Sequence, residues 1–154
     1  MPNHFHFMIH TDEKCLVLEK QGGNMLNPIS NAVRILLSGY ARIYNSRYSR
    51  SGSIFRQKTK AKCLTEISLD KSGAKENLFY ATTCFHYIHQ NPLVAGLCKS
   101  MEDWPYSSFK DYFSLNQASL CNMDLAAKYC GFQPSSFVET SLKRYNLKIE
   151  RGSE

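Results

Sequence analysis

The chain has 154 residues, 43% hydrophobic and 12% aromatic, which is enough apolar side chain for one folded domain and excludes an intrinsically disordered chain. No apolar run reaches the roughly 20 residues of a membrane span, and the first residues lack the basic and apolar stretches of a secretory signal. The net charge is +6, and the distribution of the cations along the chain is more informative than this sum.

The six cysteines include no C-x-x-C pair, so the sequence indicates neither a zinc knuckle nor a thioredoxin motif. Because no signal for an oxidising compartment is visible, we expect mostly buried thiols in a cytosolic protein. The cysteines are Cys15, Cys63, Cys84, Cys98, Cys121 and Cys130.

Residues 4–10 alternate strictly between two kinds of side chain, which predicts a strand. Two histidines at i and i+2 of a strand point the same way, so His4 and His6 could hold one divalent ion. Taken alone, such a pair is more often a surface or core feature, and both interpretations stay open. One face would carry Phe5, Phe7 and Ile9, and the other His4, His6, Met8 and His10.

The next element should be a helix that begins after Asn27, since an N-cap asparagine precedes Pro28. Gly22-Gly23-Asn24 predicts a loop before it, and the polar stretch 46–53 predicts a loop after it. The helix should end near Asn45. Its apolar stripe is Val33, Leu36, Leu37, Tyr40 and Tyr44.

The segment between Lys20 and Thr65 contains no acidic residue, although cations recur along it. Residues 54–63 alternate and predict a strand with cations on one face. Charge of one sign, interleaved with tyrosines and glycines, favours a nucleic-acid partner; a solvated basic face without a ligand is the alternative. The expected DNA-binding residues are Arg42, Arg47, Arg50, Arg56, Lys58, Lys60 and Lys62.

Residues 75–91 predict a second helix, which Pro92 should end. Tyr87 and Asn91 lie one turn apart, and Tyr80 and Cys84 continue their face. A phenolate can attack phosphorus covalently and an amide oxygen can bind a metal, but with nine tyrosines in the chain a core role for Tyr87 is favoured on this pattern alone. The expected core side chains are Leu78, Ala81, Phe85 and Ile88, and short helices should follow at 124–129 and from Ser136.

Several stretches together resemble a known family. Met1-Pro2-Asn3-His4-Phe5-His6-Phe7 resembles the M-P-[ND]-H-hydrophobic-H strand of HUH single-strand transposases. Four further stretches, in family order within residues 1–113, resemble the branch called REP-associated tyrosine transposases. They are Tyr44-Asn45-x-Arg47-Tyr48-x-Arg50-x-Gly52-x-Ile54-Phe55, the run Lys58–Lys62, Tyr87-Ile88-His89-x-Asn91-Pro92-Leu93-Val94-Ala95-Gly96-Leu97, and Trp104-Pro105-Tyr106-Ser107-Ser108-Phe109.

The resemblance implies a site and a reaction. His4, His6 and Asn91 match the ligands of a divalent ion, Mg or Mn, and Tyr87 matches the catalytic tyrosine. The third ligand is Gln in the insertion-sequence branch, and Gln90 is adjacent to Asn91 here. The implied reaction nicks and rejoins single-stranded or hairpin DNA through a 5′-phosphotyrosine. His10 and His89 match no catalytic position and should be structural.

The implied fold is α+β, an antiparallel ferredoxin-like (HUH) sheet with helices on one face. Family members carry a further strand and helix before the HUH strand, so we expect an incomplete sheet here. Residues 1–113 would form the catalytic core, truncated at its N-terminus, and residues 114–154 a helical extension.

Two other classes of protein remain open. One is a remnant that binds nucleic acid without a working site; an in-frame strand and helix encoded upstream of Met1 would favour the enzyme instead. The other is a small structural protein that binds metal through His4, His6 and a cysteine in a closed site. The expected location is the cytoplasm, at the nucleoid, with no membrane partner, and a homodimer stays open.

Overall fold

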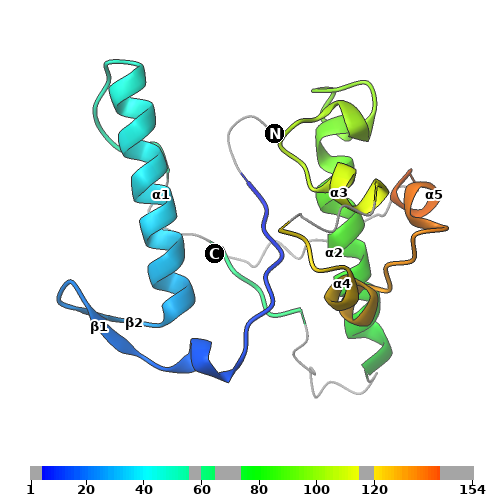
Figure 1. Cartoon of the computed structure of the whole chain (residues 1–154), viewed down its shortest axis with the longest axis horizontal. Helices are drawn as coiled ribbons and strands as arrows, with labels where there is room; N and C mark the ends of the chain where they lie inside the picture. Colours follow the sequence, from blue (N-terminus) through cyan, green and yellow to red (C-terminus); the bar gives the residue numbers. More distant parts are fainter. Residues whose placement is uncertain (1–4, 56–59, 65–73, 115–119, 143–154) are drawn as a thin grey trace, which may run out of the picture. The chain divides into compact units, whose positions relative to one another are not determined.

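The computed structural model describes residues 5–55, 60–64, 74–114 and 120–142. Within these residues the protein is mixed α+β, with several helices and one two-stranded antiparallel sheet (Figure 1). This confirms the α+β class. The chain divides into two compact units, Ile9–Lys62 and Met1–Met8 with Cys63–Glu154, which we name the basic unit and the core unit. The division expected near residue 113 stays a prediction.

The basic unit begins with a short 3-10 helix, η1 (Glu13–Leu16), and a hairpin of β1 (Glu19–Gln21) and β2 (Asn24–Leu26). Lys20 pairs with Met25 at the centre of the hairpin. The predicted loop is its two-residue turn, in which Gly22 and Gly23 have φ of 56° and 89°. A turn with two positive φ angles matches the twist of paired strands and favours glycine at both positions.

Helix α1 (Pro28–Arg47) follows the hairpin and confirms the helix expected after Asn27. The Asn27 side chain accepts a hydrogen bond from the Ser30 backbone N–H at 2.8 Å, so it caps the helix as its sequence indicates. The helix continues two residues beyond Asn45, and no residue of it is buried. Its apolar stripe is therefore partly exposed, with Leu36 at 55% and Tyr40 at 54%.

The core unit is built around α2 (Ala74–Val94). Helices α4 (Met123–Cys130) and α5 (Phe137–Leu142) and the 3-10 helix η2 (Met101–Asp103) pack against α2, and α3 (Phe109–Phe113) packs against α5 and η2 (Figure 1). Two of the expected core residues of α2, Ala81 and Phe85, are buried. The buried cluster consists of Phe85, Met101, Phe109, Ala126, Cys130, Phe132 and Phe137.

The end of α2 differs from its prediction, because the helix passes through Pro92 and ends at Val94. Pro92 lacks a backbone donor but lies in the last turn, where its carbonyl still accepts a bond from the Leu97 N–H at 3.0 Å. Gly96, with φ of 68°, reverses the chain. Gly131 ends α4 as predicted, in a left-handed conformation with φ of 64°.

Neither strand expected from alternation is present in the described residues. Residues 5–10 are extended but belong to no sheet, and residues 54–55 and 60–63 form no strand. A strand needs a neighbour that pairs with its backbone, and β1 and β2 pair only with each other. Alternation indicates only which side chains point to the same side of an extended chain. It does not indicate that a second strand is available to pair with it.

All six cysteines are free thiols. The expectation that they are mostly buried is wrong, since Cys130 is buried, Cys63 is exposed and the other four are half-buried. Burial of Cys130 raises its pKa to about 11, so this thiol is protonated at neutral pH.

Candidate functional site

His6 and Tyr87 lie side by side in the core unit. Their ring centroids are 5.7 Å apart and the ring planes meet at 78°, an edge-to-face arrangement. Tyr87 is half-buried on α2, whereas His6 is exposed on the extended N-terminal segment. The structure therefore brings together an imidazole and a phenol that stand 81 positions apart (87 − 6) in the sequence.

Met8 anchors the segment that carries His6. Its side chain packs against the buried cluster, and its sulfur lies 3.4 Å from the Cys130 sulfur. In an extended segment, residues two apart point to the same side, so anchoring Met8 also directs His6 toward the helices. Phe5 and Phe7 take the opposite side, where their rings contact each other at 4.9 Å and Phe7 is 58% exposed.

The other expected metal ligands are less completely described. Asn91 lies one turn beyond Tyr87 on α2 and is 8% exposed, and Gln90 beside it is 6% exposed. His4 lies outside the described residues. Among the residues that are described, no group of three or more His, Cys, Asp or Glu side chains could hold a metal ion.

Two buried histidines on α2 support the helix packing around Tyr87. His86 Nδ1 lies 2.7 Å from the Ser141 Oγ of α5, and His89 Nε2 lies 2.9 Å from the Ser108 Oγ before α3. Burial lowers the pKa of each imidazole to about 4, so both are neutral at pH 7. This agrees with the structural role expected for His89; the role of His86 was not expected, because nothing near it in the sequence indicates Ser141.

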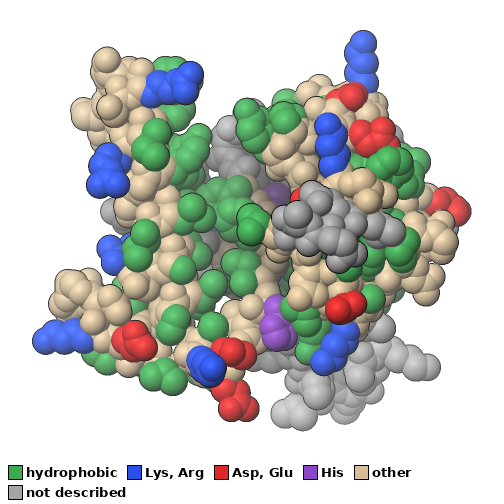
Figure 2. Space-filling model, viewed as in Figure 1, with side chains coloured by type: hydrophobic (Ala, Val, Ile, Leu, Met, Phe, Trp, Pro, Cys, Tyr) green, Lys and Arg blue, Asp and Glu red, His purple; other side chains and the backbone are tan. Residues whose placement is uncertain are grey.

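The expected DNA-binding cations that the structure describes all lie in the basic unit. Arg42 and Arg47 are exposed on α1, and Arg50 is exposed in the loop that follows. Lys60 and Lys62 are also exposed, whereas Arg56 and Lys58 fall outside the described residues. Helix α1 carries no acidic residue, and Figure 2 shows blue side chains, all arginines, spaced along it.

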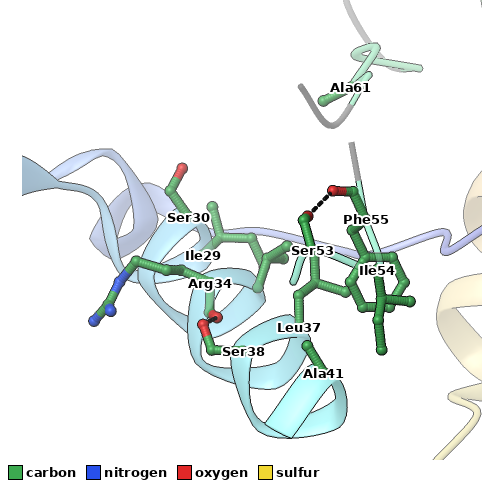
Figure 3. Close-up of a pocket in the computed structure, with 11 residues that line it drawn as sticks. Ile29, Ser30, Arg34, Leu37, Ser38, Ala41, Ser53, Ile54, Phe55 and Ala61 are labelled. Atoms are coloured by element: carbon green, nitrogen blue, oxygen red, sulfur yellow. Dashed lines mark hydrogen bonds between the residues drawn. The ribbon is translucent and has the colours of Figure 1, made fainter. Parts of the chain in front are cut away.

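An open, mostly apolar pocket of about 660 Å³ also lies in the basic unit (Figure 3). Leu37 and Ala41 of α1 contribute one side, and Ile54 and Phe55 contribute another. Its described lining includes no His, Cys, Asp or Glu, so it lacks the groups that acid–base chemistry or metal binding requires. It is a separate feature from the His6–Tyr87 pair.

Comparison with protein-family models, with curated proteins and with solved structures finds no match to this chain. Within the described part of the chain, no helix is both long enough and apolar enough to cross a bilayer. The assignment of the candidate site therefore rests on the contact between His6 and Tyr87 and on the chemistry of these two side chains.

Proposed function

We propose that this protein is a metal-dependent transposase of the HUH type that nicks and rejoins single-stranded hairpin DNA at Tyr87. The observation that carries the proposal is the contact between His6 and Tyr87, with ring centroids 5.7 Å apart. A phenol beside an imidazole can serve nucleophilic attack on phosphorus, because the imidazole can bind a metal ion or exchange a proton.

In this reaction the Tyr87 Oη attacks the scissile phosphorus as the bond to the 3′ oxygen breaks. The phenol loses its proton, the departing 3′ oxygen gains one, and the 5′ phosphate stays bound to the tyrosine. Attack by a 3′-OH on this phosphotyrosine reverses the step and rejoins a strand. Tyr87 is half-buried on α2, and its ring and the His6 ring stand edge-to-face.

His4, His6 and Asn91 are the proposed ligands of a divalent ion, Mg or Mn. The amide oxygen of Asn91, one turn along α2, is of the carbonyl type that Mg and Mn prefer, and the imidazole beside Tyr87 would add a nitrogen ligand. When bound, the ion would polarise the scissile phosphate. In the working protein, residues 4–10 would be a strand of a ferredoxin-like sheet, since Phe5 and Phe7 leave an apolar side open.

The basic unit would hold the DNA by its phosphates, and the protein would act at the nucleoid. Its exposed cations Arg42, Arg47, Arg50, Lys60 and Lys62 support this part of the proposal. Neutralised phosphates release counterions, so binding should weaken as salt rises.

The test is a covalent protein–DNA band on a denaturing gel, formed with hairpin DNA and Mn²⁺. Because the proposed adduct is a 5′-phosphotyrosine, DNA labelled at its 3′ end should label the protein, and DNA labelled at its 5′ end should not. Tyr87→Phe should abolish the band and leave DNA binding nearly unchanged. Tyr80→Phe is the matched control on the same helix and should retain it. A band that persists in Tyr87→Phe would refute the assignment.

A second candidate is a protein that binds nucleic acid without cutting it. One observation favours it: among the described residues, Phe5–His10 joins no sheet, although the proposed reaction needs this segment as a strand. This candidate predicts DNA binding that depends on the basic unit, with no adduct from either labelled end in the wild-type chain.

A further inference from the structure

Two tyrosines of α1 and the tyrosine at its C-cap form a row. Tyr40, Tyr44 and Tyr48 follow one another at intervals of four residues, so they share one face of the helix. The ring centroids of Tyr40 and Tyr44 are 6.1 Å apart with planes at 23°, and those of Tyr44 and Tyr48 are 4.5 Å apart. Phe55 lies 5.7 Å from Tyr40 and extends the row at its other end.

This row is accessible from solvent. Tyr40 is 54% exposed and Tyr48 is 59% exposed, although burying an aromatic side chain is among the larger apolar gains available to a protein. Tyr48 ends the row at the C-cap of α1. A further flat aromatic ring can therefore stack on Tyr48 and continue the row.

A loop with fixed geometry places a cation over this row. The Arg50 backbone N–H donates to the Asn45 carbonyl at 3.0 Å, and the Asn45 side chain donates to the Gly52 carbonyl at 2.9 Å. Ser49 between them has a φ of 48°, an uncommon conformation that these bonds maintain. The Arg50 guanidinium carbon then lies 5.7 Å from the centre of the Tyr44 ring. A guanidinium stacked on a ring keeps its N–H groups available for an anion at the edge.

The charge around the row identifies the occupant. Arg47 directly precedes Tyr48, Arg50 follows in the loop, and α1 carries no acidic residue. A partner that offers both flat rings and regular negative charge is a single-stranded nucleic acid, whose bases stack on aromatic side chains while its phosphates meet cations. An apolar protein surface would use the rings and leave the cations without a role.

We infer that Tyr40, Tyr44, Tyr48 and Arg50 form a stacking site for the unpaired nucleotides of single-stranded DNA. The inference rests on the proposed function for the choice of DNA, and it assigns bases to one face of α1. Stacking needs neither the metal nor Tyr87, so binding can be measured separately from cleavage.

The experiment measures the binding of two fluorescent oligonucleotides of equal length to the full chain, in EDTA. One is oligo(dT) and the other carries abasic sites in place of every base, so both present the same phosphates. Wild-type protein should bind oligo(dT) more tightly. Tyr48→Leu should weaken that binding roughly tenfold and leave abasic binding unchanged, since stacking depends on the base.

Two further variants separate stacking from charge and from general damage. Arg47→Gln should weaken the binding of both oligonucleotides alike and reduce the salt slope by about 0.7, as for one lost phosphate contact on a single strand. Tyr106→Leu is the matched control, because Tyr106 is 85% exposed but belongs to the core unit, and it should bind like wild type. The helix content of each variant is checked by circular dichroism.

Three results would overturn the inference. They are equal wild-type affinity for oligo(dT) and the abasic strand, an unchanged oligo(dT) affinity in a folded Tyr48→Leu variant, and tighter binding of oligo(rU) than of oligo(dT), which would assign the site to RNA. A failed proposed function gives a different pattern, in which no adduct forms with Mn²⁺ while the difference between the oligonucleotides persists.

Discussion

Lowering the pH should destabilise the core unit through two buried histidines. The pKa of His89 is lowered from 6.5 to about 4, first by burial and then by repulsion from His86. Because the folded pKa lies below the unfolded one, the unfolded chain binds more protons below pH 6.5. Stability from this group is therefore complete above pH 6.5 and is lost as the pH falls through about 4.

The size of the effect follows from these two pKa values. At pH 5 about 97% of unfolded imidazoles are protonated, against about 10% of native His89. The free energy of unfolding is therefore about 2 kcal/mol lower at pH 5 than at pH 7. His86, whose pKa is also about 4, adds a smaller amount, about 1 kcal/mol, because two interacting histidines do not contribute additively. A total of about 3 kcal/mol is a large part of the 5–15 kcal/mol that stabilises an ordinary domain.

The assay is urea unfolding at pH 7 and pH 5, followed by the fluorescence of Trp104, the single tryptophan, which lies in the core unit. His89→Gln should lower stability at pH 7, because the hydrogen bond to Ser108 changes. It should also reduce the difference in unfolding free energy between pH 7 and pH 5 by about 2 kcal/mol. His10→Gln alters an exposed histidine of the basic unit and should retain the full difference. Equal stability of the wild type at both pH values would refute the reasoning.

Three other substitutions test the architecture. Phe85→Ala should cost about 3–5 kcal/mol in urea unfolding, because Phe85 is 4% exposed at the centre of the buried cluster, whereas Phe113→Ala at a 54% exposed site should cost far less. Asn27→Ala removes the cap of α1 and should cost about 1 kcal/mol, measured by the thermal loss of helix signal; no change would contradict the capping geometry. Met8→Ala should cost about 1–2 kcal/mol and, if the proposed function holds, should lower adduct yield by releasing His6 from Tyr87, whereas Met8→Leu should preserve both. An adduct yield unaffected by Met8→Ala would show that this anchor does not position His6.

Helices were the part of this fold that local sequence could predict. Asn27 caps α1, and Gly131 ends α4, because both act on backbone groups only a few residues away. Pro92 misled the prediction for the end of α2, since a missing donor costs little in the last turn and Gly96 reverses the chain. The β1–β2 hairpin was missed, because its short strands lack an alternating pattern of buried and exposed residues.

The candidate site was likewise predictable only in part from the sequence. His6 and Tyr87 could be named from the sequence, by alternation and by helical spacing, but their contact depends on Met8 packing beside Cys130 from a distant helix. The pairs His86–Ser141 and His89–Ser108 likewise join residues that only the packed helices bring together. Helical hydrogen bonds close within a turn, so nearby residues determine them. A strand, a metal site or a buried polar pair needs a partner from elsewhere in the chain, and only tertiary packing supplies it.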